Sequence, residues 1–217
     1  MIVLAHRGAC WDAPENTLEA FELAIANEAD YVEFDVRTAR DGRLVVAHDP
    51  LRFDPAPGTP TLDQTLATLR GRVGLAVEIK EQRTTERVLG ALGAHRIPSE
   101  SVIVCSGRIR ALELVRRRRP EVRCLLHLGG RPDPTAASAF WGVGFRDDTA
   151  RPRQIALARS FGLAVTVWTV NDPARMRDLA ALGVDGIFTD RPGLLRETMR
   201  EVGRPQPEAK HRKHVQG

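Results

Sequence analysis

The sequence predicts an α/β fold, specifically a (β/α)₈ barrel built as a single compact domain with reduced loops. Three observations lead to this prediction. Short β-branched, apolar runs alternate with helical patterns, about eight such units can be counted, and no G-x-G-x-x-G turn occurs. Parallel neighbouring strands need helical crossovers, so the alternation favours a parallel sheet. The competing fold, a doubly wound sheet, usually has about five or six strands and a glycine-rich first turn.

The predicted strands are the short apolar runs. They span residues 2–5, 31–36, 44–47, 75–79, 102–105, 122–126, 142–145, 164–168 and 186–189, and the third is a hairpin-like addition to the second. Helical patterns lie between most of them, at residues 17–27, 62–69, 85–94, 108–118, 152–162 and 173–182. The connection over residues 127–141 has room for a short helix at most, which makes it the weakest unit.

Several predicted helices carry end signals. The sequence NTLE at residues 16–19 has a capping-box pattern and predicts Asn16 as the N-cap. The sequence NDP at residues 171–173 predicts a capped helix with proline in its first turn. Gly162 and Gly183 follow helical patterns and predict their carboxyl-terminal ends.

Composition places the chain among ordinary globular proteins. It has 217 residues, 42% of them apolar and 28% charged, which is enough for its own core. No apolar stretch reaches the roughly 18–20 residues of a membrane-spanning helix, and the first residues do not resemble a signal peptide. Cys10, Cys105 and Cys124 lack metal or redox spacing. We therefore expect reduced thiols and a cytoplasmic location.

The basic surplus does not predict a nucleic-acid partner. The net charge is +4, and the arginines are scattered apart from residues 116–119, which we interpret as a solvated helix face. Aromatic residues make up 5% of the chain and do not interleave with a basic stripe. Residues 203–217 are polar and aperiodic, so we expect a barrel domain over residues 1–202 followed by a disordered basic tail.

Three carboxylates are expected to meet at the carboxyl-terminal rim of the barrel, where catalytic groups of such barrels lie. Glu33 and Asp35 point to one face of their strand because side chains alternate, and Glu78 ends the next barrel strand. Carboxylates this close repel one another unless a cation lies among them. Their oxygens suit Mg²⁺ or Ca²⁺, and also Mn²⁺, so the sequence predicts one divalent metal ion.

Two histidines and two cations are expected at the same rim. His6 and His48 titrate near neutrality and suit general base and general acid roles. Arg7 and Lys80 supply fixed positive charge, which suits a phosphate. A hard metal, two acid/base histidines and two cations together indicate phosphoester chemistry.

These residues resemble the glycerophosphodiester phosphodiesterase family. The motifs HRG-x₅-PENT-LEAF (residues 6–21), YVEFDVR-x₃-DG-x-LVVAHD (residues 31–49), VEIK, VWTVND and GIFTDRP follow the family's order from residue 3 to about 193. The resemblance implies a TIM barrel that hydrolyses a small-molecule glycerophosphodiester to glycerol 3-phosphate and an alcohol. It implies that Glu33, Asp35 and Glu78 bind the metal and that His6 and His48 are the catalytic pair.

The resemblance also implies a substrate-binding set. In it Arg7 binds the phosphate, Glu15 of PENT orients the metal's surroundings or the substrate, Lys80 is a site lysine, and Trp168 of VWTVND forms a pocket wall. The family further suggests that the adjacent glycerol hydroxyl attacks first and that water then opens a cyclic phosphate. Which histidine is the base stays open.

Some residues have two interpretations. We assign His95 and His127 structural hydrogen-bonding roles, and we favour a helix cap over a rim contact for Asp190. Asn16 is a cap or a site residue, with the cap favoured. Trp11 contacts substrate or covers the barrel mouth.

The chain departs from the family pattern after residue 49, where residues 50–60 replace a longer insertion, and the segment after Leu128 is also reduced. A more open mouth suggests a first alternative, a phospholipase D-like hydrolase of lysophospholipids or sphingolipids. Its candidate rim residues are Trp11, Phe53, Phe140 and Trp141, although core packing is favoured for the last two. The second alternative is a non-catalytic phosphate- or nucleic-acid-binding barrel. Headgroup preference, metal identity and oligomeric state are not predicted.

Overall fold

The computed structural model describes residues 1–129 and 133–203. Eight parallel strands form a closed barrel, which confirms the predicted (β/α)₈ fold. The strands are β1 (Ile2–Ala5), β2 (Tyr31–Thr38), β4 (Gly74–Ile79), β5 (Val102–Ser106), β6 (Arg123–Leu128), β7 (Gly142–Arg146), β8 (Ala164–Trp168) and β9 (Gly186–Thr189). The ring closes because β1 pairs in parallel with both β2 and β9.

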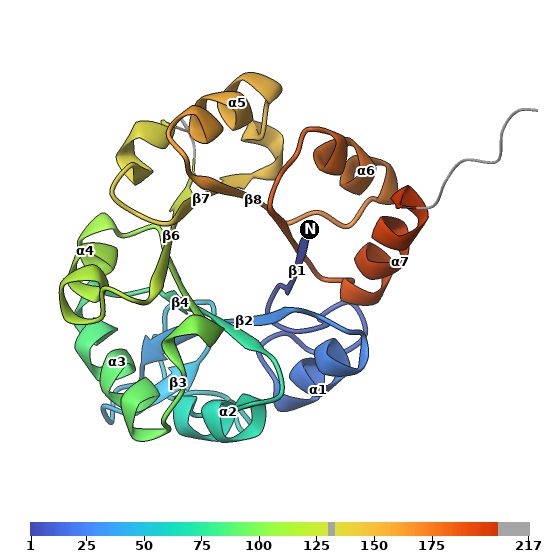
Figure 1. Cartoon of the computed structure of the whole chain (residues 1–217). Coiled ribbons are helices and arrows are strands. Elements are labelled where there is room, and N and C mark those ends of the chain that lie inside the picture. Colours follow the sequence, from blue (N-terminus) through green and yellow to red (C-terminus); the bar gives the residue numbers. More distant parts are fainter. Residues whose placement is uncertain (130–132, 204–217) are drawn as a thin grey trace, which may run out of the picture.

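Helices surround the strands as an outer ring (Figure 1). They are α1 (Leu18–Ala26), α2 (Leu62–Leu69), α3 (Thr85–Ala94), α4 (Ile109–Arg118), α5 (Pro152–Ser160), α6 (Pro173–Ala181) and α7 (Pro192–Val202). The extra strand β3 (Leu44–Val46) pairs antiparallel to β2, as the hairpin-like run predicts. Within residues 133–141, the connection from β6 to β7 holds a single 3₁₀ turn, η3 (Pro134–Ala137), in agreement with the short helix expected there.

The start of α1 differs from the prediction. Thr17, not Asn16, is the N-cap, because the Thr17 hydroxyl accepts the backbone N–H of Ala20 at 3.2 Å. Asn16 has a left-handed φ of +58° and turns its side chain away from the helix toward β2. The prediction of Asn16 as the cap is therefore wrong. Thr17 already supplies a hydroxyl one residue closer to the first turn.

The other predicted helix ends are present. Asp172 caps α6 by accepting the backbone N–H of Ala174, with Pro173 in the first turn. Gly162 and Gly183 follow α5 and α6 with left-handed φ values of +72° and +73°. Gly203, the first residue of the predicted tail, is the C-cap of α7, and residues 204–217 lie outside the described residues. Among the described residues, no helix combines the length and apolarity needed to cross a bilayer.

Apolar side chains pack in two layers. The larger layer lies between strands and helices, and a smaller one fills the barrel interior, comprising Leu4, Ala76, Ile103, Cys105, Leu125 and Phe188. Burying one large aliphatic side chain contributes about 1.5–3 kcal/mol. Glu33 of β2 pairs in register with Ala76 of β4. The alternation that directs Ala76 inward therefore also directs Glu33 into the interior.

Candidate active site

A cavity of about 240 Å³ contains most of the predicted site residues. Its lining residues are His6, Arg7, Glu33, His48, Glu78, Lys80, Gly107, His127, Gly129, Trp168 and Phe188. Among the residues predicted for the site, Asp35 and Glu15 do not line the cavity, but both contact Arg7, which does. The structure thus brings residues from β2, β4 and β8, and from the segments that follow β1 and β3, to one place, as the sequence predicts.

The turn after β1 shapes one wall of the cavity. Arg7 and Gly8 both have left-handed φ values, +54° and +89°. A Cβ on Gly8 would lie 2.7 Å from backbone and side-chain atoms of Ala20 in α1, so glycine is required for both its φ and its close packing. The turn directs the backbone N–H of Arg7 at Glu33 Oε2, 2.8 Å away. The HRG sequence therefore fixes the position of a carboxylate as well as an arginine.

The three predicted metal ligands converge. Asp35 and Glu78 are in register on neighbouring parallel strands, and ligand atoms of Glu33, Asp35 and Glu78 lie within 4.8 Å of one another. Glu33 and Asp35 are each 1% exposed. Burial, and then the charges of Asp35 and Glu78, raise the pKa of Glu33 well above its ordinary value. The protein alone thus opposes the charged state that a metal ion would favour.

Two cations already partly balance these acids. Lys80 Nζ lies 3.2 Å from Asp35 Oδ1 and 3.1 Å from Glu78 Oε1, and Arg7 Nε lies 3.2 Å from Asp35 Oδ2. Burial alone would lower the pKa of Lys80, but the charges of Glu78 and Asp35 outweigh it and raise that pKa. Arg7 also pairs through Nη1 with the half-exposed Glu15 at 2.6 Å.

Among the described residues, Asp35 Oδ1 and Glu33 Oε1 are both buried without a hydrogen-bond partner, but only Asp35 Oδ1 has an ion pair, with Lys80. Glu33 Oε1 therefore has neither kind of partner in the described part of the chain. A buried acceptor of this kind is costly unless something pairs with it. The oxygen belongs to a group of three carboxylates, the donor set that hard divalent cations prefer. Glu33, Asp35 and Glu78 therefore fit a divalent metal ion.

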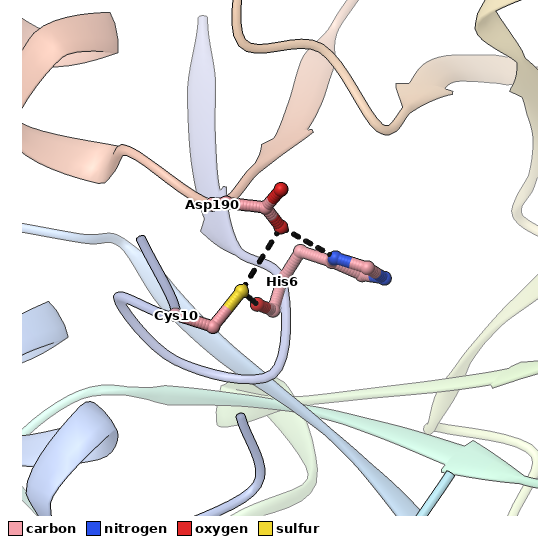
Figure 2. A group of neighbouring side chains, drawn as sticks. All are labelled: His6, Cys10 and Asp190. Carbon is pink, nitrogen blue, oxygen red and sulfur yellow. Dashed lines mark hydrogen bonds and ion pairs between the residues drawn. The ribbon is translucent and has the colours of Figure 1, made fainter. Parts of the chain in front are cut away.

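His6 is oriented by a hydrogen-bonded group that Figure 2 shows. Its Nδ1–H donates to Asp190 Oδ1 at 2.8 Å, and its other ring nitrogen points away from Asp190 (Figure 2). Cys10 Sγ donates to the same oxygen at 3.1 Å, and Asn171 Nδ2 donates to Oδ2 at 2.6 Å. Burial alone would raise the pKa of Asp190, but hydrogen bonds from His6, Cys10 and Asn171 outweigh it and lower that pKa to about 2.

The favoured helix-cap role of Asp190 is wrong. The N-cap of α7 is Arg191, without a side-chain capping bond, whereas Asp190 turns to His6. The rim alternative is what the structure shows. His48 resembles His6 in one respect, because its Nδ1 lies 2.9 Å from Asp49 Oδ1. In both histidines Nδ1 is engaged by a carboxylate, which leaves Nε2 for a ligand.

The sequence does not predict His127 as a site residue, because a structural role is favoured for it. Its Nδ1 lies 3.4 Å from Glu78 Oε2, and its ring packs against Trp168 and Phe188 with centroid separations of 5.5 and 5.4 Å. His127 thus lines the cavity. His95, at the end of α3, bonds to Asp63 and is a structural histidine. The signal was present in the sequence. His127 stands two residues after Leu125, an interior residue, so alternation along the strand directs both side chains inward. The same i, i+2 relation predicts that Asp35 and Glu33 share a face.

The aromatic rim candidates divide into two groups. Phe140 and Trp141 pack against the core, as favoured. Trp11 and Phe53 are 60% and 77% exposed and do not line the cavity. Trp11 lies under Arg191, whose guanidinium carbon is 4.6 Å from the ring centroid.

Known proteins resemble the chain over nearly its whole length. The model of the glycerophosphoryl diester phosphodiesterase family matches residues 6–73 and 51–194. YhdW of Bacillus subtilis is 29% identical over 90% of this chain and 96% of that protein. The glycerophosphodiester phosphodiesterase of Caldanaerobacter subterraneus is 26% identical over 93% of this chain and 99% of that protein. An Oleispira antarctica phosphodiesterase, solved with its product sn-glycerol-3-phosphate, has a TM-score of 0.84 and 23% identity, covering 92% of this chain and 97% of that one.

Proposed function

The chain belongs to the glycerophosphoryl diester phosphodiesterase family, an enzyme family that hydrolyses glycerophosphodiesters, and from this premise we propose a reaction that uses one divalent metal ion and two histidines. The products are glycerol 3-phosphate and an alcohol. One observation carries the proposal. Glu33 and Glu78 line a single cavity and converge with Asp35 as a set of carboxylates suited to a metal ion. The same cavity is lined by two histidines whose Nε2 atoms are left for a substrate. The glycerol 3-phosphate bound to the Oleispira antarctica phosphodiesterase supports the assigned product.

Glu33, Asp35 and Glu78 would hold the metal ion, which we propose to be Mg²⁺ or Ca²⁺, with Mn²⁺ as a third option. When bound, the ion supplies positive charge for phosphate oxygens and lowers the pKa of a coordinated hydroxyl. Asn16 orients Asp35, and the backbone N–H of Arg7 orients Glu33.

His6 and His48 transfer the protons. One Nε2 removes a proton from the attacking hydroxyl, and the other protonates the departing alkoxide. Asp190 is a positioning residue for this step, because its hydrogen bond fixes the tautomer and the orientation of His6. We retain the proposal that the adjacent glycerol hydroxyl attacks first, giving a cyclic phosphate that water opens.

Arg7 and Lys80 place fixed positive charge on the cavity wall, where a phosphate would bind. Glu15 holds the guanidinium of Arg7 through the 2.6 Å ion pair. Trp168 covers the side of the cavity formed by β8. These residues bind and orient the phosphodiester but move no proton.

The experiment that tests the proposal is a coupled assay of glycerol 3-phosphate release. The protein is stripped with EDTA, each divalent ion is added back singly, and a panel of glycerophosphodiester headgroups is supplied. The proposal expects release that depends on the added ion. Full release in EDTA, or none with any ion and any headgroup, contradicts it.

Exposed Trp11 and Phe53 support the alternative of a phospholipase D-like hydrolase. Such an enzyme would accept lysophospholipids or sphingolipids with apolar chains, which exposed aromatic groups could contact. A comparison of glycerophosphocholine with a lysolipid distinguishes the two functions, because the alternative predicts faster hydrolysis of the lysolipid. The non-catalytic barrel has less support, since the chain retains every proposed metal ligand and both histidines.

The three cysteines are free thiols in the structure. They support the proposed cytoplasmic location, because structural disulfides are typical of oxidising compartments. The proposed division of the chain remains a barrel domain over residues 1–202 and a tail over residues 203–217.

A further inference from the structure

Two buried polar atoms in the cavity have no role in the reaction described above. His127 Nε2 and Trp168 Nε1 are both buried, and neither has a hydrogen-bond partner among the described residues. Buried polar groups in folded proteins are nearly always paired, so an unpaired one at a cavity wall indicates a ligand contact. Both residues line the cavity.

The two atoms are complementary. His127 Nδ1 faces Glu78 Oε2 at 3.4 Å, and a carboxylate can accept but not donate. The Nδ1 therefore carries a hydrogen, and in the tautomer with its hydrogen on Nδ1 the imidazole Nε2 is an acceptor. The indole Nε1 of Trp168 is a donor. A hydroxyl group both donates and accepts, so one hydroxyl can satisfy both atoms.

The two side chains are neighbours at the cavity wall. Their ring centroids lie 5.5 Å apart, and both residues line the cavity. Phe188 packs edge-on against His127 from β9 and supplies an apolar wall. An apolar wall with one donor and one acceptor favours a neutral hydroxyl over a charged group.

The neighbouring strand is adapted to the imidazole. Gly144 of β7 pairs in register with His127, and a Cβ at Gly144 would lie 2.6 Å from His127 Cδ2 and 3.2 Å from Nε2. Any larger residue would displace the ring. Glycine at this position is thus required by the place that His127 occupies in the barrel interior.

We propose that His127, together with Trp168, binds the terminal hydroxyl of the glycerol unit and so determines specificity for glycerol phosphodiesters. This inference rests on the proposed function, in which the adjacent hydroxyl is the one that reacts. The terminal hydroxyl is then the remaining polar group of the glycerol unit. His127 and Trp168, on β6 and β8, supply the two unpaired atoms that this hydroxyl would satisfy.

The test compares two substrates with the same choline leaving group. One is glycerophosphocholine. The other is the phosphocholine ester of propylene glycol at its primary carbon, which keeps the adjacent hydroxyl and lacks the terminal one. We expect the wild-type kcat/KM to favour the glycerol substrate by about 10-fold to 100-fold, because the analogue leaves two buried groups unpaired. In His127→Leu this preference should fall to within about twofold.

The ratio of the two substrates separates recognition from a purely structural role. Loss of the His127 contact with Glu78 can weaken metal binding, but it affects both substrates equally when the metal ion is saturating. His127→Gln, which keeps an acceptor oxygen, should restore part of the preference. It also serves as the second variant if His127→Leu does not fold. His95→Leu removes a histidine outside the cavity and should leave the ratio unchanged.

A wild-type preference that persists in folded His127→Leu or His127→Gln at its full size overturns the inference while the proposed function stands. A wild-type enzyme that hydrolyses the two substrates equally well also overturns it. Failure of the wild type to hydrolyse any glycerophosphodiester of the headgroup panel, with every metal ion tried, contradicts the proposed function and the inference with it.

Discussion

Asn16 holds Asp35 at two points. Its Nδ2 donates to Asp35 Oδ2 at 3.0 Å, and its Oδ1 accepts the backbone N–H of Asp35 at 3.3 Å. Both residues are buried, at 5% and 1% exposure. Asn16 thus fixes the orientation of a proposed metal ligand instead of capping α1. Groups that orient a ligating carboxylate affect the affinity for the metal.

Asn16→Ala should weaken metal binding by about 10-fold to 100-fold, because Asp35 loses its orienting partner. Isothermal titration of the EDTA-stripped protein with Ca²⁺ or Mg²⁺ measures the change. Thr17→Ala is the matched control. It removes the cap of α1, destabilises the protein by about 1 kcal/mol and should leave metal affinity unchanged. Unaltered affinity in Asn16→Ala contradicts this role.

Glu33→Gln should abolish most of the stabilisation that a divalent ion gives the protein. In the wild type the ion relieves repulsion among three carboxylates, two of them buried, so Tm should rise when it is added after EDTA treatment. In the variant one ligand charge is missing, and the rise should be small. Glu22→Gln, which alters an exposed carboxylate paired with Arg72, serves as the control. Equal rises in Glu33→Gln and wild type would show that Glu33 does not bind the ion.

Asp190→Asn should lower kcat by about 10-fold to 100-fold by disturbing the orientation of His6. Stability offers a second readout. The pKa of Asp190 is lowered in the folded protein from 3.8 to about 2, so its charged form contributes stability that is present above pH 3.8 and is lost as the pH falls toward 2. This contribution is about 2 kcal/mol. The difference in unfolding free energy between wild type and variant should therefore shrink over that range, and a difference that stays constant would contradict the assignment.

Gly8→Ala should destabilise the protein by about 2–4 kcal/mol. The substitution forces a left-handed φ on alanine and places its Cβ 2.7 Å from Ala20. Gly42→Ala is the matched control, because Gly42 has a similar φ of +87° and nothing within 4 Å of a Cβ. It should cost about 1 kcal/mol. Urea unfolding of both variants measures the difference, and equal losses would exclude a packing role for Gly8.

The fold was predictable because it depends on local periodicity. Alternating strand and helix patterns identify the barrel, and the i, i+2 relation places Glu33 beside Asp35 without further information. The same i, i+2 relation places His127 on the interior face of its strand. It was not enough to predict a site residue, because a lone histidine has many structural roles and its partner Glu78 stands on a different strand.

Contacts between distant segments were not predictable. His6 and Asp190 are 184 positions apart and meet because β9 pairs with β1 at closure of the barrel. Asn16 illustrates a second limit. A capping sequence can be satisfied by Thr17 one residue later, and this frees Asn16 for a contact with Asp35 that sequence spacing does not show. Site residues held by through-space partners therefore required the structure.

In the proposed reaction, His6 and His48 act as the acid/base pair beside a metal ion bound by the carboxylates. The most direct measurement is kcat for glycerophosphodiester hydrolysis by His6→Ala and His48→Ala at saturating metal ion, with metal affinity determined in parallel. We expect each variant to lose about 10²-fold to 10⁴-fold in kcat while binding the ion normally. Wild-type turnover in both variants would contradict the claim.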